Sequence, residues 1–183
     1  MIQPSSENVI VTALRRGQVR RAVGMLVDSY NDDLYCYCAS LLGTASGARV
    51  YQQALAAAIG NLGSYQGQAS LRAWLFAIAR GATLEHQWRH PALYPEAREQ
   101  GYCPLPDQRR AADERQPRAA ETVDLSQFPP ATQEILQLRL WHGLHLREVA
   151  FVIGRPVGEV RHQASEALAL LALTGGHPGQ APS

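Results

Sequence analysis

The stretch that decides the fold begins Phe128-Pro-Pro-Ala-Thr-Gln-Glu-Ile-Leu136 and ends at Leu171. Near its middle, Gly154-Arg155-Pro156 separates two amphipathic segments. A glycine ends a helix at low cost, because a left-handed residue without a Cβ meets no steric penalty. A proline suits the start of the next helix, where a missing N–H is no loss. The stretch therefore predicts two short helices joined by a tight turn.

The apolar residues of both segments recur at helical spacing. They are Val149, Ala150 and Ile153 in the first segment and Val157, Val160, Ala164, Ala167, Leu168 and Leu171 in the second. Steps of three and four place each set on one helical face, and the small Ala150 lets the helices cross closely. This pattern is typical of a helix-turn-helix, whose second helix enters the DNA major groove. An ordinary αα-hairpin in a helical core fits the same spacing, so both interpretations stay open here.

Length, composition and charge limit the possible classes of protein. The chain has 183 residues, enough for one large or two small domains, and 46% of them are hydrophobic. The net charge is +1, so a contact with nucleic acid must come from local patches. Three cysteines are too few for a disulfide framework, and we find no signal peptide and no run of eighteen apolar residues. We expect a soluble cytoplasmic protein with no membrane partner.

Upstream of this stretch the pattern also predicts helices. Breaks are expected at Gly17, at Asn31-Asp32-Asp33 (a turn or N-cap), at the Gly43–Gly47 loop and at the polar loop 63–69. Ser70 is the expected N-cap of the helix that follows. The residues expected to face inward in the last two of these helices are Ala48, Tyr51, Leu55, Ala58, Ile59, Leu62, Leu71, Trp74, Leu75, Ile78 and Ala82. Arg72 and Arg80 would then be left to solvent or to phosphate.

The helical pattern is interrupted once. Pro91 to Thr122 contains five prolines and little apolar periodicity, which predicts a linker. We therefore predict an all-α chain of two small helical domains, residues 1–90 and 124–174, joined by a flexible linker over 91–123. The second domain contains the helix-turn-helix. Residues 175–183 are expected to form a disordered tail.

Two stretches carry a resemblance to a known family. The run Gly63-Ser-Tyr-Gln-Gly-Gln-Ala-Ser-Leu-Arg-Ala-Trp-Leu-Phe-Ala-Ile-Ala-Arg80 resembles the promoter-reading segment of bacterial sigma factors of the extracytoplasmic-function group. The stretch from Phe128 to Leu171 is similar to the C-terminal helix-turn-helix of the same group, including the Pro-Pro pair, Gly143-Leu144 and Val157-Gly158. The order matches too, and a linker stands where the family has one. The resemblance covers about four-fifths of the chain.

The resemblance implies a factor that binds core RNA polymerase and directs promoter recognition and transcription initiation. The first domain would engage the polymerase clamp and the −10 element, and the second the −35 element. The expected partners are core RNA polymerase and promoter DNA, with an anti-sigma or other regulatory protein as a further candidate. The expected DNA-binding residues are Tyr65, Gln66, Gln68, Arg72, Arg80, Arg155, Glu159, Arg161, His162 and Ser165. The expected polymerase-binding residues are Arg49, Gln52 and Gln53.

The polymerase-binding positions depart from the family's pattern. The matching helix in the family begins in an acidic cluster, whereas this chain has Ser46, Ala48, Arg49 and Gln53 there. No charged residue occurs between Val50 and Leu71. The last helix also differs, carrying Gln163 and Glu166 where the family tends to be basic. A divergent sigma factor is one interpretation. The alternative is a sigma-like protein that has lost standard polymerase binding and acts as a protein-interaction or regulatory module.

Other chemistries have little support in the sequence. We find no nucleophile elbow, phosphate-binding glycine loop or paired catalytic carboxylates, so we expect no enzyme and no cofactor. Cys36, Cys38 and Cys103 could contribute to a zinc or thiol redox site, but Cys38 fits a small core residue better and we expect no metal. His142 and His145 flank Gly143, where exposed polar residues are expected.

Overall fold

The computed structural model describes residues 4–90, 93 and 125–174. Their helices are α1 (Pro4–Arg15), α2 (Val19–Leu42), α3 (Thr44–Asn61), the 3-10 turn η1 (Leu62–Ser64), α4 (Leu71–Arg89), α6 (Pro130–Leu140), α7 (Leu146–Ile153) and α8 (Val157–Thr174). The described residues contain no strand, which confirms the predicted all-α class. The predicted linker and tail lie outside the described residues, apart from Leu93, so the domain boundaries stay a prediction.

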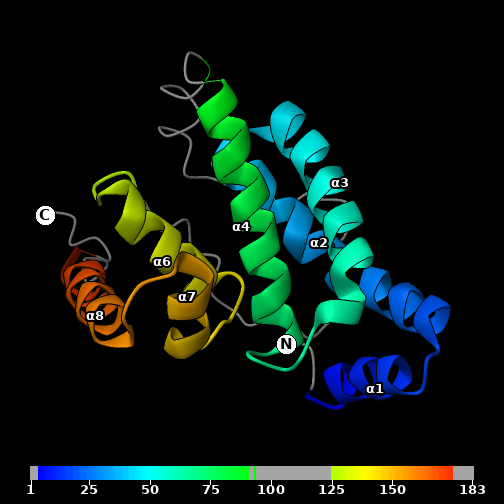
Figure 1. The fold of residues 1–183 in the computed structure, drawn as a ribbon. Helices are drawn as coiled ribbons and strands as arrows, with labels where there is room; N and C mark the ends of the chain where they lie inside the picture. Colours follow the sequence, from blue (N-terminus) through cyan, green and yellow to red (C-terminus); the bar gives the residue numbers. More distant parts are fainter. Residues whose placement is uncertain (1–3, 91–92, 94–124, 175–183) are drawn as a thin grey trace, which may run out of the picture.

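The helices form two groups that meet along α4. Helices α1–α3 pack on one side of α4 and α7 packs on the other, with α6 beside α7 and α8 farther from α4 (Figure 1). One hydrophobic core runs through both groups, from Leu26 of α2 through Phe76 of α4 to Val149 of α7. Helix α4 is therefore buried on more than one face, and Ala73, Phe76 and Ala79 are as buried as the predicted Leu71 and Leu75.

Helix α2 continues through Asn31-Asp32-Asp33, where the sequence predicted a turn or N-cap. Tyr30, Leu34, Tyr37 and Cys38 lie on one face of the unbroken helix and are all buried. Asn and Asp disfavour a helix interior only weakly, and the burial of this apolar face outweighs that preference. The prediction of a break there was wrong.

The connection between α2 and α3 is a single residue, not the predicted loop up to Gly47. Gly43 has φ +75° and α3 begins at Thr44. Gly47 lies inside α3 against α2, where an added Cβ would come within 2.5 Å of the Cα of Ala39. Gly47 therefore permits a close helix crossing. The buried face of α3 consists of Gly47, Val50, Ala54 and Ala58. It is rotated slightly from the predicted face, because the predicted core residues Tyr51 and Leu55 are only partly buried.

The C-terminal stretch forms two helices joined by a tight turn, at the positions that the sequence predicted. Gly154 ends α7 in the left-handed conformation, with φ +72° and ψ 34°, and Pro156 immediately precedes α8. Val160 and Ala164 are buried, as expected from their spacing. Leu168 is an exception, with 38% of its surface exposed, because the buried face of α8 continues through Ala167 to the partly buried Leu171 instead.

We expect Gly47→Ala to destabilise the protein by about 1–3 kcal/mol, because the backbone of Ala39 must move to admit a methyl group. Gly24→Ala is the matched control, since Gly24 lies in the interior of α2 with open space around its Cα. That change should stabilise the protein by roughly 0.5–1 kcal/mol through helix propensity. Urea unfolding of the two variants measures both effects, and equal stabilities would contradict the close crossing.

Candidate nucleic-acid and polymerase interface

The predicted recognition residues lie on the solvent-facing side of α8 and in the turn just before it, which contains Arg155. Arg155, Glu159, Arg161, His162 and Ser165 are all exposed. Arg155 Nη1 lies 3.0 Å from Glu159 Oε1, and His162 forms a looser contact of 3.6 Å with Glu166. Exposed i,i+4 pairs contribute little to stability, so these side chains can exchange partners at low cost. The face can therefore present both donors and acceptors to DNA.

The predicted promoter loop is partly closed on itself. Tyr65 is half-buried; its hydroxyl donates to the Ala69 carbonyl at 2.7 Å and its ring lies 5.5 Å from the Trp74 ring. The backbone N–H of Gln66 donates to Gln68 Oε1 at 3.0 Å, across Gly67 at φ +78°. Ser70 caps α4, as predicted, by accepting from the N–H of Ala73 at 3.1 Å. Gln66 and Gln68 remain exposed, and Trp74 is a core residue.

The expectation that Arg72 and Arg80 face solvent was wrong. Arg72 Nη2 lies 2.6 Å from Asp33 Oδ2 of α2, and its guanidinium lies 5.9 Å from the centre of the Phe76 ring. Arg80 makes two hydrogen bonds to Glu134 of α6, at 2.8 and 3.3 Å. Both arginines are held by carboxylates of α2 and α6, and their contact with DNA stays a prediction.

Glu134 connects the two groups of helices. It accepts the hydroxyl of Tyr37 at 2.7 Å as well as the Arg80 guanidinium, and we call Tyr37, Arg80 and Glu134 the Glu134 cluster. Burial raises the pKa of Tyr37 well above its usual value, with a further contribution from the Glu134 charge, so the phenol stays a hydrogen-bond donor. The Glu134 carboxylate helps to raise the pKa of Arg80, against the effect of burial. Charge-assisted bonds of this kind are about twice as strong as neutral ones.

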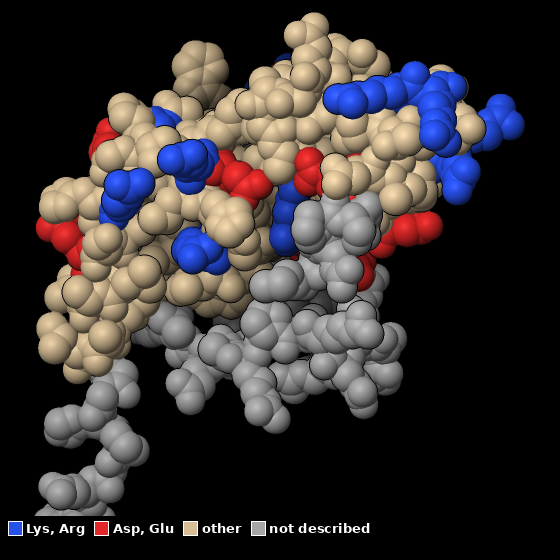
Figure 2. All heavy atoms as spheres, turned by 90° about the horizontal axis from the view of Figure 1, so that it is seen from below, with Lys and Arg blue, Asp and Glu red and all other residues tan. Residues whose placement is uncertain are grey.

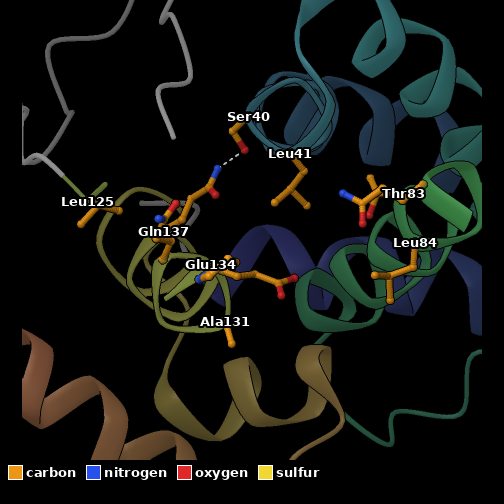
Figure 3. A pocket seen from close by; sticks show the side chains of 11 residues that line it. Ser40, Leu41, Thr83, Leu84, Leu125, Ala131, Glu134 and Gln137 are labelled. Carbon is orange, nitrogen blue, oxygen red and sulfur yellow. Dashed lines mark hydrogen bonds between the residues drawn. The ribbon is translucent and has the colours of Figure 1, made fainter. Parts of the chain in front are cut away.

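Further polar contacts lie along the same boundary. Gln137 of α6 donates to the hydroxyl of Ser40 in α2, and the hydroxyl of Ser70 donates to Glu148 of α7. Glu148 also accepts the backbone N–H of His145 at 2.8 Å, so it stabilises the start of α7 as well. A cavity of about 240 Å³ lies between α2, α4 and α6, where Gln137 points toward Ser40 (Figure 3). Its lining has one carboxylate, Glu134, which is already bonded, so the cavity has no pair of acid and base groups.

His142 is buried at this boundary, contrary to the expected exposure. Only 4% of its surface is accessible, and its ring lies 4.9 Å from that of Phe76 and 5.8 Å from that of Tyr37. Neither ring nitrogen has a hydrogen-bond partner. Burial lowers the pKa of His142 to about 3, with the positive charge of Arg72 acting in the same direction. The side chain therefore packs as a neutral aromatic ring.

The predicted polymerase-binding residues are on the outer side of α3. Arg49, Gln52 and Gln53 are exposed, and the Val50–Leu71 interval presents no charge. The described residues hold no helix long and apolar enough to cross a membrane. Nor do they contain a group of three or more metal-ligating side chains.

The cysteines lie apart from these surfaces. Cys38 is buried, which raises the pKa of its thiol to about 12, and Cys103 lies outside the described residues.

Neither the Glu134 cluster nor the burial of His142 could be predicted from the sequence. Tyr37 and Glu134 are 97 residues apart, and no pattern of neighbouring residues indicates that they pair. Glutamate is a favourable helix residue in any protein, so its presence in α6 does not by itself indicate a partner. Only the packing of α6 on α2 and α4 brings the Glu134 carboxylate next to Tyr37 and Arg80.

We expect Glu134→Gln to destabilise the protein by about 1–3 kcal/mol, because it leaves the largely buried Arg80 without a counter-charge. Glu85→Gln is the matched control: it removes the exposed Glu85–Arg89 pair, which should change stability by less than about 0.5 kcal/mol. Urea unfolding checks both values. A Glu134→Gln protein as stable as the Glu85→Gln protein would show that the cluster does not stabilise the fold.

Stability should also fall in acid because of His142. The pKa is lowered on folding, so the unfolded chain binds more protons between the usual value near 6.5 and about 3. The free energy of unfolding should therefore decrease below about pH 6.5, by up to about 1.4 kcal/mol per pH unit from this group. Urea unfolding at about pH 7.5 and pH 5.5 should show this loss in the wild type but less of it in His142→Leu. His145→Leu, at an exposed histidine, should keep the full loss.

Comparison with known proteins identifies relatives over most of the chain. No family model matches. The chain is 29% identical over 172 residues to the "Probable RNA polymerase sigma-C factor" of Mycobacterium bovis and to the "ECF RNA polymerase sigma factor SigC" of Mycobacterium tuberculosis, covering 91% of this chain and 92% of each relative. The structure of CnrH in complex with the cytosolic domain of CnrY has a TM-score of 0.63 at 20% identity, covering 94% of this chain and 99% of CnrH, and shows a shared fold. The predicted resemblance is confirmed.

Proposed function

We propose that this chain, a relative of the extracytoplasmic-function sigma factors, binds core RNA polymerase and directs it to promoters in the cytoplasm. The observation that supports this most is the similarity to sigma factors over 91% of the chain, because it includes both groups of helices and their order. The chain would have no catalytic site of its own. The polymerase would supply the chemistry, and this protein would supply the contacts with DNA.

In this proposal, α8 reads duplex DNA in the major groove. The helix follows the turn at Gly154 and Arg155, and its exposed face carries Glu159, Arg161, His162 and Ser165. Arginine can donate in a bidentate manner to guanine, and glutamate can accept from cytosine. Arg161 is the side chain on this face best suited to a base or phosphate contact, because Arg155 is paired with Glu159.

The loop between η1 and α4 would meet the separated strand of the −10 element. Gln66 and Gln68 offer exposed amide groups for base edges, and Gly67 provides a backbone conformation that other residues rarely adopt. Tyr65 would stack on a base only after giving up its contact with Ala69. The arrangement is suited to holding an unstacked base beside a polar loop.

The Glu134 cluster has a consequence for this activity. Arg80 can contact a DNA phosphate only if it leaves Glu134, which belongs to the other group of helices. The same separation would expose the faces of α4 and α7 that now pack together. We therefore propose that promoter binding by Arg80 is accompanied by the opening of this boundary.

A regulatory partner is a further part of the proposal. CnrH, whose fold this chain shares, was solved as a complex with the cytosolic domain of CnrY. By analogy we propose that an anti-sigma protein binds this chain. The analogy concerns the fold, and the residues that would meet such a partner are not assigned by it.

The alternative is a sigma-like protein with another partner, and the surface of α3 favours it. A helix that lacks charge from Val50 to its end at Asn61 offers little attraction to a basic clamp surface. Mixing the purified chain with core polymerase separates the two functions. A sigma factor should co-purify with the polymerase and support run-off transcription from genomic fragments. The absence of both would favour the alternative.

Restoring acid on α3 tests whether this helix meets the polymerase. We expect Arg49→Asp with Gln53→Glu to tighten core polymerase binding several-fold at low salt, because it replaces a like charge with an attraction that salt screens. Both positions are exposed, so stability should change little. Arg147→Asp, a charge reversal at an exposed arginine of α7, is the control and should not tighten binding. If the Arg49→Asp, Gln53→Glu protein binds polymerase no better than the wild type, α3 does not face the clamp.

A further inference from the structure

Four exposed arginines surround the turn between α1 and α2, and we call Arg15, Arg16, Arg20 and Arg21 the basic corner. The turn is tight: the N–H of Gly17 donates to Leu14 and that of Gln18 to Ala13, both at 2.9 Å, with Gly17 at φ +72°. This geometry brings the end of α1 and the start of α2 together, so the four guanidinium groups share one end of the molecule. Arginines gather at one end of the face seen in Figure 2.

The basic corner lacks counter-charges within the described residues. No ion pair there includes any of its four arginines, whereas Arg72, Arg80, Arg89 and Arg155 all have carboxylate partners. Neighbouring like charges repel one another, and a bound anion would relieve that repulsion. All seventeen basic residues of the chain are arginines, whose planar guanidinium groups match phosphate oxygens in a bidentate geometry.

A hollow of about 310 Å³ lies beside these arginines. It is lined by Asn8, Val9, Thr12, Ala13, Arg16, Gln18 and Arg21. The polar members all carry hydrogen-bond donors, and no carboxylate lines it. The size and the chemistry are those of a site for a phosphate group held by two arginines and neighbouring amide or hydroxyl groups.

The position of the basic corner points to DNA. The Glu7 carboxylate of α1 accepts the backbone N–H of Leu71 at 2.5 Å, which attaches α1 to the start of α4 and so to the 63–70 loop. The positive charge of Arg15 reaches Tyr65 of that loop and acts to lower the pKa of its hydroxyl, although burial raises it overall. A strand bound at the loop would therefore lie near the arginines of the corner.

We propose that the basic corner binds the phosphate backbone of the promoter strand next to the 63–70 loop, with Arg16 and Arg21 holding one phosphate in the adjoining hollow. This assignment rests on the proposed sigma function, because that function brings the strand to the loop. It adds a sequence-independent contact beyond the positions predicted to read bases.

The test is Arg16→Gln with Arg21→Gln in the full-length protein. Its binding to a short fluorescein-labelled single-stranded DNA is followed by anisotropy over a range of salt concentrations. Losing the one phosphate that the two arginines hold should lower the slope of log K against log salt by about 0.7 and weaken binding roughly fivefold at about 0.1 M salt. Arg89→Gln with Arg147→Gln removes the same charge from exposed positions on other helices, and should bind DNA like the wild type.

Three results would overturn the proposal. The first is an affinity and a salt slope that do not change in the Arg16→Gln, Arg21→Gln protein. A wild-type protein that shows no salt-dependent binding to single-stranded DNA, either alone or in complex with polymerase, would count in the same way. The second is a loss of core polymerase binding with DNA binding intact, which would assign the corner to polymerase. The third is a loss of binding to phosphatidylserine vesicles alone. If the DNA result is as expected but run-off transcription fails with every protein, the sigma function fails and the phosphate site stands.

Discussion

The contact between Glu134 and its two partners, Tyr37 and Arg80, is the interaction on which the arrangement of the helices depends. Glu134 belongs to α6, and its partners belong to α2 and α4, so one carboxylate connects the two groups. Its side chain is largely buried, as is that of Arg80. Taking either charge out of water is costly unless the other is present, so the boundary between the groups requires both. The apolar packing of Phe76 and His142 lies directly beside it.

The same contact links structure to the proposed activity. Arg80 lies in the segment that resembles the promoter-reading part of sigma factors, yet its guanidinium is held by a helix of the other group. A phosphate and the Glu134 carboxylate would therefore compete for the same donors. Exposed arginines have no buried carboxylate to compete with a phosphate. Those of the basic corner form no ion pair within the described residues, and Arg155 has only a weak surface pair with Glu159. For the proposed contact with DNA the chain thus has two classes of arginine, and only the exposed class could bind a phosphate before the helix groups separate.

The surface of α3 raises a separate question of partner choice. Its inner face is specialised for close packing, with Gly47 against the backbone of Ala39. Its outer face is almost neutral, with Arg49 as its one charge near the start. A neutral face gains little from long-range attraction, so any partner that binds it must rely on shape and apolar contact. This favours a polymerase contact that has diverged from the family's, or a different protein partner.

The sequence by itself determined the helices, the turn at Gly154, the N-cap at Ser70 and the exposed face of α8, because these depend on periodicity and on residues a few positions apart. It also determined the family resemblance. Only the tertiary structure decided that α2 runs through Asn31-Asp32-Asp33, that His142 is buried and that Arg72 and Arg80 have carboxylate partners. Those features depend on contacts between residues far apart in the chain, such as Tyr37 and Glu134. The burial of such residues outweighs the local preference of the chain for a helix or a turn.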